Sequence, residues 1–289
     1  MILALIRTLR PRQWVKNSFV AAPLFFSLRL LDPVSVQRTL AAVALFSLIS
    51  GCVYVLNDLV DVEADREHPK KRNRPIASGA LPASVARSFL MVAVPVAVAL
   101  SLWLAPMFAA VLGTYFVLNV AYSLRLKNIA YLDVLLIALF FILRVLAGAF
   151  AIDVEASPWL LGCTFLLALF LGFGKRAHEL ATAVDASKQR AALARYDLPS
   201  LRWILYVLAA AVVLTYGAYT RSPQTVEAFG TDALIYTVPL PLLAILRFIQ
   251  LSTRNEDSES PTDGMLRDPL FMTAFGLYVV MTGALLYWG

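Results

Sequence analysis

Charged residues are scarce in this chain, and so are cysteine and histidine. Only 15% of the 289 residues are Asp, Glu, Lys or Arg, whereas 60% are hydrophobic, and the mean hydropathy is +0.73. This composition excludes an ordinary soluble domain and is typical of a protein with many membrane-spanning helices. Cys52 and Cys163 both fall in apolar stretches and indicate neither a disulfide nor a zinc site. With His68 and His178 as the only histidines, a histidine-rich metal site is excluded.

Three motifs of soluble catalytic folds are also missing. The chain has no G-x-x-x-x-G-K-[ST], no G-x-S-x-G and no G-x-G-x-x-G that follows a strand. These absences exclude a P-loop enzyme, an α/β hydrolase and a Rossmann dehydrogenase. Because Arg10, Arg12 and Lys16 follow the first apolar residues without a small-residue cleavage site, we expect no cleaved signal peptide. The net charge of +6 reflects membrane topology and anion sites, so we expect no nucleic-acid partner.

Long apolar stretches occupy most of the chain. Crossing the core of a bilayer takes about 20 residues in an α-helix. Nine stretches are close to that length and cover roughly 17–32, 39–56, 86–105, 107–124, 130–152, 157–174, 203–220, 233–250 and 269–288. The sequence therefore predicts an all-α polytopic membrane protein with nine transmembrane helices, forming a single domain over residues 1–289.

The distribution of Lys and Arg predicts the orientation of these helices. With the N-terminus in the cytosol, all but four of the 25 basic residues lie in or beside cytosolic segments, as the positive-inside rule requires. The exceptions are Arg29, Arg38, Arg144 and Arg221. The long charged loops 57–85 and 175–202 then lie on the cytosolic side. We therefore expect the chemistry at the cytosolic face of the inner membrane.

A cluster of carboxylates directly follows the second apolar stretch. On a helix, Asp58, Asp61 and Asp65 fall within a narrow arc, with Asn57 at its edge and Glu63 pointing away. Converging carboxylates repel one another unless a cation joins them, and oxygen ligands suit Mg²⁺ that shares its shell with substrate phosphates. The pattern predicts a Mg²⁺ site, with a solvated helix end as the simpler alternative.

Basic residues before the first apolar stretch and after the second are candidates for phosphate binding. Cations beside a metal site hold the phosphate oxygens that the metal leaves uncovered. Only 12 residues separate Lys16 from Arg29, too few for an α-helix to span, so one of the two must lie near membrane depth. Since Arg29 can extend outward, Lys16 is the better candidate for a site. Arg66, Lys70 and Arg74 are the candidates that follow the carboxylates.

A third group of polar residues lies at the start of the fifth apolar stretch. Tyr122 and Lys127 fall at a short basic turn, and Asp133 lies one helical turn into the stretch. A buried carboxylate requires a cation, a metal or a hydroxyl as its partner. A ribose hydroxyl or Lys127 meets this requirement for Asp133, and a salt bridge between two spans is the alternative.

Basic residues at and inside later spans form the fourth group. Lys175 and Arg176 end a long apolar stretch, where the phosphate of a lipid would lie. The spacing of Lys175 and Glu179 also fits an ordinary helix pair. Arg144 lies in the middle of a span, where an arginine is costly without a partner. We expect Arg144 to pair with Asp133, with a lipid phosphate or with a group that the sequence does not reveal.

The motifs together resemble the UbiA superfamily of intramembrane prenyltransferases over nearly the whole chain. They read R-P-R-Q-W-V-K-N (Arg10–Asn17), N-D-L-V-D-V-E-A-D-R (Asn57–Arg66), R-P-I-A-S-G (Arg74–Gly79) and Y-S-x-x-L-K-x-x-x-x-x-D (Tyr122–Asp133). In combination they are similar to the branch of decaprenyl-phosphate phosphoribosyltransferases. One departure from the wider superfamily supports this branch. Where typical members carry a second Asp-rich motif after the sixth span, this chain reads K-R-A-H-E from Lys175.

The resemblance implies an all-helical UbiA-type bundle and a Mg²⁺-dependent transfer. The 5-phosphoribosyl group of phosphoribosyl diphosphate would pass to a polyprenyl phosphate, with release of diphosphate, for the synthesis of a cell-envelope sugar donor. In this assignment the catalytic residues are Asp58, Asp61, Lys127 and Asp133, and the metal ligands are Asn57, Asp58, Asp61 and Asp65. The donor would be bound by Lys16, Asn57, Asp65, Arg66, Lys70, Arg74 and Tyr122, and the acceptor by Arg144, Lys175 and Arg176.

Two other functions stay open at the level of sequence. A UbiA-type prenyltransferase would use a polyprenyl diphosphate and an aromatic or quinone acceptor, although the missing second Asp-rich motif disfavours it. A transporter or lipid carrier fits a weak internal repeat, in which spans 1–4 and spans 5–8 each contain one long charged loop, and it fits the intramembrane Arg144. A carboxylate cluster at the membrane surface, however, does not suit a transport site at the bilayer midplane. A homo-oligomer is compatible with either assignment.

Overall fold

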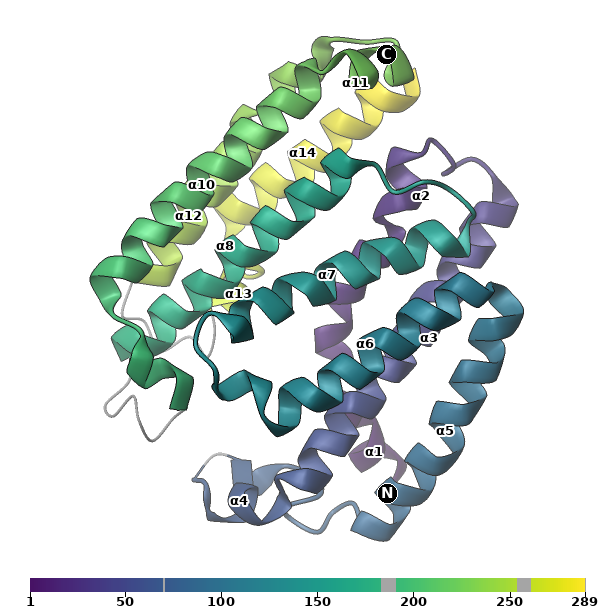
Figure 1. Ribbon diagram of the computed structural model, residues 1–289, viewed down its shortest axis with the longest axis vertical. Coiled ribbons are helices and arrows are strands. Elements are labelled where there is room, and N and C mark those ends of the chain that lie inside the picture. Colours follow the sequence, from purple (N-terminus) through teal and green to yellow (C-terminus); the bar gives the residue numbers. More distant parts are fainter. Residues whose placement is uncertain (70, 183–190, 254–260, 289) are drawn as a thin grey trace. The chain divides into compact units, whose positions relative to one another are not determined.

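The structure is a computed structural model that describes residues 1–69, 71–182, 191–253 and 261–288 (Figure 1). All of the secondary structure in these ranges is helical. The chain divides into two compact units, residues 1–124 with 143–156 and residues 125–142 with 157–289. A single helix, α7 (Leu132–Ala151), contributes its first half to the second unit and its second half to the first.

Eight helical segments are long and apolar enough to cross a membrane, counted over the described ranges. They are α3 (Pro33–Val60), α5 (Ala83–Leu104), α6 (Pro106–Leu124), α7, α8 (Pro158–Thr182), α10 (Leu198–Arg221), the segment Ala233–Ser252 and α14 (Pro269–Trp288). The segment Ala233–Ser252 comprises η5 (Ala233–Thr237) and most of α12 (Pro239–Thr253). The prediction of an all-α polytopic membrane protein is confirmed, whereas the cytosolic N-terminus and the single domain stay predictions.

Shorter helices connect these segments. They are α1 (Ile2–Leu9), α4 (Val62–Glu67), η2 (Lys71–Asn73), η3 (Leu126–Asn128), η4 (Ala191–Arg195), α11 (Pro223–Phe229) and α13 (Pro261–Met265). In the second unit α8 packs against α10, and α12 packs against α14. In the first unit α3 packs against α5, α6 and α1.

Three long helices begin in a similar way, with a capping aspartate and a proline one or two residues after it. Asp32 accepts hydrogen bonds from the backbone N–H groups of Val34 and Ser35 at the start of α3. Asp197 caps α10 in the same way, and Asp268 accepts from the backbone N–H of Phe271 in α14. The carboxylates satisfy N–H groups that have no partner within the helix, and proline in the first turn has none to satisfy.

The first expected span, residues 17–32, is not one α-helix. Its residues belong to an 11-residue 3₁₀ helix, η1 (Pro11–Ala21), followed by the five-residue helix α2 (Ala22–Phe26). η1 lies along α3, and the Asn17 amide donates hydrogen bonds to the hydroxyls of Ser47 and Ser50. The segment is therefore absent from the eight long helices, and a ninth transmembrane helix is not confirmed.

The 3₁₀ conformation makes this segment longer than an α-helix with the same number of residues. A 3₁₀ helix rises about 2.0 Å per residue instead of 1.5 Å, so η1 and α2 together extend about 30 Å, roughly the thickness of a bilayer core. Lys16 lies within η1, however, and the 12 residues between Lys16 and Arg29 rise at most about 24 Å even at the 3₁₀ spacing, so the expectation that one of these two charges lies near membrane depth stays a prediction. Lys16 is partly exposed and donates a hydrogen bond to the side chain of Gln13 at 2.7 Å.

A glycine in α7 allows η1 to approach closely. A Cβ atom on Gly148 would lie 1.9 Å from the backbone oxygen of Val20 and 3.2 Å from Pro23. Because the obstacle is backbone, no side-chain rotation relieves the overlap. The position therefore requires glycine for packing.

Gly148→Ala is expected to destabilise the protein by at least about 1–3 kcal/mol through overpacking, measured as thermal unfolding in detergent. The matched control is Gly162→Ala in α8, since nothing lies within 4 Å of its Cβ position. The control should be neutral or slightly stabilising, because alanine favours helix. Equal unfolding temperatures for the two variants would show that η1 does not pack against α7 as described.

Candidate active site

The carboxylate cluster of the first unit lies where α3 ends and α4 begins. Asp61 separates the two helices, so the arc expected for one continuous helix is interrupted there. Asp58 and Asp65 are nonetheless both buried, at 2% exposure each. Glu63 is exposed and pairs with Arg66 at 2.9 Å, as expected for a residue that points away from the cluster.

Two arginines hold the buried carboxylates together. Arg74 Nη1 donates to Asp58 Oδ1 at 3.2 Å and to Asp65 Oδ2 at 2.7 Å. Arg10 Nη2 donates to Asp58 Oδ1 at 2.7 Å, and its guanidinium lies 4.8 Å from the centroid of the Tyr54 ring. Arg74 was among the predicted site residues, whereas Arg10 was not. Its place in the R-P-R-Q-W-V-K-N motif was the signal that could have identified it.

The chemistry of this cluster fits Mg²⁺. Its donors are all oxygens, and the side-chain oxygen of Asn57 is buried without a hydrogen-bond partner. Within the described ranges, however, no three His, Cys, Asp or Glu side chains lie close enough together to hold a metal. Guanidinium groups neutralise Asp58 and Asp65 instead. Binding of a metal by Asp58 therefore requires Arg10 and Arg74 to give up that carboxylate.

The other residues predicted to bind or orient the donor differ in how exposed they are. Arg66 is exposed and also donates to the backbone oxygen of Ala77 at 3.4 Å. Tyr122, near the end of α6, and Lys127, in η3, are both partly buried. Lys70 lies outside the described residues.

Arg144 is buried in α7 within the first unit. Its Nε donates to Asn17 Oδ1 and its Nη2 to the hydroxyl of Tyr115, both at 3.0 Å. The guanidinium also lies 5.3 Å from the ring centroid of Phe46 and 5.0 Å from that of Tyr115. Amide, hydroxyl and aromatic groups thus surround the charge, through hydrogen bonds and cation–π contacts. Pairing of Arg144 with Asp133 is not observed, and its acceptor-binding role stays a prediction.

Asp133 instead forms a salt bridge between two spans of the second unit. Its Oδ2 lies 2.9 Å from Arg176 Nε, and the two side chains are 0% and 2% exposed. Arg176 also pairs with Glu179. The alternative of a salt bridge for Asp133 is therefore the one that the structure shows. Because Arg176 is buried against this carboxylate, we revise its expected role from acceptor binding to holding Asp133.

Lys175 is the accessible cation at this end of α8. Its side chain is 41% exposed, and its Nζ lies 3.9 Å from Glu179 Oε1. The helix-pair interpretation thus applies, but the contact is long and partly solvated, so it holds the ammonium group weakly.

A tyrosine that the sequence did not single out completes this cluster. The hydroxyl of Tyr196 donates to Asp133 Oδ1 at 2.7 Å and accepts from the backbone N–H of Tyr131 at 2.6 Å. Burial raises the pKa of Tyr196 above its usual value, so its hydroxyl stays protonated. Tyr196 precedes the Asp197 cap of α10, and no sequence motif marked it as a site residue.

Comparison with known proteins identifies the family. Residues 18–286 match the UbiA prenyltransferase family. The chain belongs to this family. The predicted resemblance to UbiA proteins is therefore confirmed, and with it the all-helical fold.

Similar UbiA proteins include several named decaprenyl-phosphate phosphoribosyltransferase. That of Mycolicibacterium smegmatis is 34% identical, over 99% of this chain and 93% of its own length. The Mycobacterium tuberculosis protein is 32% identical, over 100% of this chain and 96% of its own length. The Corynebacterium glutamicum protein is 36% identical, over 84% of this chain and 75% of its own length.

Solved structures of UbiA proteins share the fold. A UbiA homologue from Archaeoglobus fulgidus bound to GPP and Mg²⁺ superimposes with a TM-score of 0.72 at 18% identity, covering 98% of this chain and 97% of that one. Digeranylgeranylglyceryl phosphate synthase gives a TM-score of 0.64 at 17% identity, covering 99% and 96%. At such identities the likeness establishes the fold alone.

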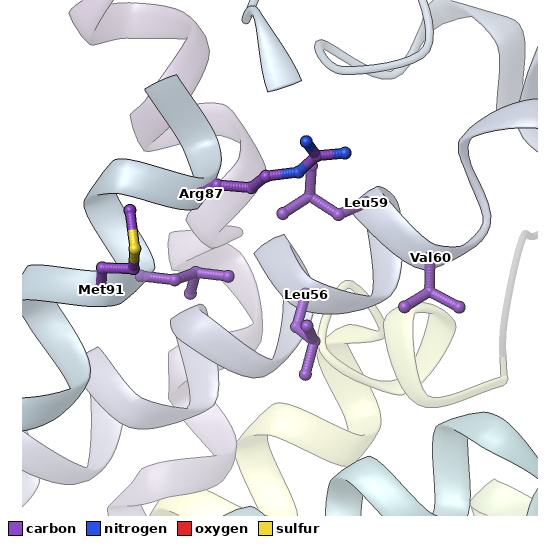
Figure 2. Close-up of a pocket in the computed structure, with 6 residues that line it drawn as sticks. Leu56, Leu59, Val60, Arg87 and Met91 are labelled. Carbon is purple, nitrogen blue, oxygen red and sulfur yellow. The ribbon is translucent and has the colours of Figure 1, made fainter. Parts of the chain in front are cut away.

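One apolar groove in the first unit of this UbiA protein lies apart from the polar clusters. It has a volume of about 470 Å³ and lies between α3 and α5, as Figure 2 shows. Its lining residues are Leu56, Leu59, Val60, Arg87, Leu90 and Met91. None of the predicted site residues lines it, so we do not assign the reaction to this groove.

Proposed function

We propose that this UbiA protein transfers a 5-phosphoribosyl group from phosphoribosyl diphosphate to a polyprenyl phosphate and releases diphosphate. The observation that carries the proposal is the identity of 32–36% to proteins named decaprenyl-phosphate phosphoribosyltransferase, two of them over nearly the whole chain. The unequal chemistry of the two units supports it. The first unit buries two carboxylates between arginines, whereas the corresponding end of α8 in the second unit carries Lys175 and Arg176.

In this proposal the first unit binds the diphosphate of the donor. Asp58, with Asn57, Asp61 and Asp65, would hold Mg²⁺, and the metal would supply positive charge for the departing diphosphate. Arg10 and Arg74, which neutralise the carboxylates in the structure, exchange these partners for phosphate oxygens when the donor and metal enter. A guanidinium fork suits both carboxylate and phosphate, so the exchange keeps its hydrogen bonds satisfied. Lys16 and Arg66 add positive charge to the same unit.

The second unit orients the sugar and the acceptor in this proposal. Asp133 accepts a hydrogen bond from a ribose hydroxyl, helped by Lys127. The anomeric carbon gains oxocarbenium character as the diphosphate leaves, as in other glycosyl transfers. Lys175 attracts the phosphate of the acceptor. Because that phosphate oxygen is already anionic, the attack requires no strong general base.

A product assay with two substrate pairs tests the function. Purified protein is incubated with Mg²⁺, labelled phosphoribosyl diphosphate and polyprenyl phosphate, and the lipid fraction is extracted. We expect labelled lipid and diphosphate release only when the polyprenyl phosphate is present. The second pair is a polyprenyl diphosphate with 4-hydroxybenzoate or a naphthoate, and we expect no product from it. A prenylated aromatic product without ribosylated lipid would overturn the proposal in favour of an aromatic prenyltransferase.

Lys175→Ala is expected to raise the KM for polyprenyl phosphate by about tenfold, with little change in kcat, because a uniform binding contact is lost. The KM for the sugar donor should not change. Initial rates measured at varied concentrations of each substrate decide this.

The matched control for that variant is Arg87→Ala, which removes an exposed positive charge at the apolar groove. It should leave both KM values unchanged. A rise in the donor KM alone for Lys175→Ala would move this lysine to the donor pocket.

A further inference from the structure

The hydroxyl of Tyr196 joins two groups at the beginning of α7. It accepts the backbone N–H of Tyr131 at 2.6 Å and donates its own proton to Asp133 Oδ1 at 2.7 Å. All three residues belong to the second unit. One oxygen atom therefore fixes both the turn that precedes α7 and the carboxylate in its first turn.

The backbone of Tyr131 is strained. Its φ of 66° lies in the left-handed region, which is uncommon for a residue other than glycine, asparagine or aspartate. Such strain persists where the surroundings enforce it, and it concentrates at functional sites. Here the hydrogen bond from the Tyr131 N–H to Tyr196 and the contact between their rings, with centroids 4.9 Å apart, enforce it.

The carboxylate of Asp133 is held from both sides. Tyr196 binds Oδ1, while Arg176 pairs with Oδ2 at 2.9 Å and in turn with Glu179. Both ends of the network are tied to helices of the same unit, α7 and α8. A carboxylate held at both oxygens keeps one orientation. A group that orients a substrate requires such a fixed orientation.

The protonation state of Tyr196 fixes the direction of its hydrogen bond to Asp133. Burial raises its pKa, so the hydroxyl keeps its proton at physiological pH. Because the Tyr131 N–H donates to this oxygen, the proton of the hydroxyl is directed to the carboxylate. The phenol therefore always presents a donor to Asp133.

From this network we propose that Tyr196 is a positioning residue, which holds the Asp133 carboxylate and the left-handed Tyr131 backbone in the arrangement that orients the sugar donor. The inference rests on the proposed function, in which Asp133 contacts the ribose. Tyr196 itself does not touch the substrate and acts through Asp133.

Tyr196→Phe tests this role because it keeps the ring and removes only the hydroxyl. A hydrogen bond to a charged group is lost, so kcat/KM for phosphoribosyl diphosphate should fall by about 10- to 100-fold. The KM for polyprenyl phosphate should stay unchanged. Hydrogen exchange of the backbone amides of residues 130–134 should become faster, since the Tyr131 N–H loses its acceptor.

The matched control is Tyr216→Phe in α10. It removes a hydroxyl that is buried in the same unit and lies 2.7 Å from Thr237 Oγ1, away from Asp133. We expect wild-type kcat/KM for the donor and unchanged exchange at residues 130–134. An equal loss of activity in the two variants would show that Tyr196 is merely structural and overturn the proposal.

A second variant covers the case in which Tyr196→Phe does not fold. Tyr131→Gly adopts the left-handed conformation without strain, so it serves as the reference background, whatever its own donor kcat/KM. The double variant Y196F/Y131G is then compared with Tyr131→Gly alone, and the same 10- to 100-fold loss is expected. Absence of that loss overturns the proposal.

The exchange measurement separates this inference from the function on which it rests. If the wild-type protein forms no ribosylated lipid, the proposed function fails. Exchange at residues 130–134 then tests the network by itself. Unchanged exchange in Tyr196→Phe would overturn the inference, whatever the activity.

Discussion

Asp58→Asn should lower kcat by about 10³-fold, which corresponds to roughly 4 kcal/mol of lost electrostatic stabilisation in the transition state. Asp58 is buried, and it is the one carboxylate that both arginines contact, at 2.7 Å for Arg10 and 3.2 Å for Arg74. Asparagine keeps the shape and a carbonyl oxygen for the arginines but removes the charge that holds a metal. Activity should therefore fall by more than stability does.

Initial rates and thermal unfolding are measured on the same preparation of Asp58→Asn. Treatment of the wild-type protein with EDTA should abolish transfer, and added Mg²⁺ should restore it. The matched control is Glu63→Gln, since Glu63 belongs to the same motif but is exposed and pairs with Arg66. Full activity of Asp58→Asn, or of the wild type in EDTA, contradicts the metal assignment. If Glu63 proves essential instead, the geometry of the cluster is wrong.

Arg176→Ala should destabilise the second unit by about 3–5 kcal/mol, because it leaves the Asp133 carboxylate buried without its cation. Asp133 is 0% exposed, so the truncation leaves a buried carboxylate without its paired cation. Chemical or thermal unfolding in detergent measures the loss. The adjacent Lys175→Ala is the control, and it should cost less than about 1 kcal/mol since its pair with Glu179 is long and partly exposed.

A double variant separates the stability of this pair from its role in the reaction. Arg176→Met with Asp133→Leu replaces both charges by apolar groups, which should restore much of the stability. Activity should stay lost, because Asp133 is absent. If Arg176→Ala instead keeps its stability and raises the KM for polyprenyl phosphate, Arg176 contacts the acceptor and the revised role is wrong.

Much of the architecture could be predicted from local sequence properties. A helix that crosses a membrane requires only a sufficiently long apolar stretch, so eight of the nine predicted spans correspond to long helices. Glu63 is exposed and Asp58 is buried, as predicted, although the break at Asp61 means that one continuous helix does not relate them.

The segment before α3 could not be predicted in the same way. Its apolar residues fit a short span, and the spacing of Lys16 and Arg29 showed that an α-helix would be too short. The 3₁₀ conformation of this segment depends on packing against α3 and on the close approach of Val20 to Gly148. Neither contact leaves a periodic pattern in the sequence.

The sequence by itself determined the fold class, the family and the residue types of both polar clusters, because composition, periodicity and short motifs are local. Only the tertiary structure decided which charges meet. Arg10 and Asp58 are 48 residues apart, Tyr196 and Asp133 are 63 apart, and Arg144 and Asn17 are 127 apart. Each buried charge had several chemically adequate partners in the sequence, and the packing of the helices within each unit selected one set, because a buried charge is stable only beside groups that the fold places within hydrogen-bonding distance.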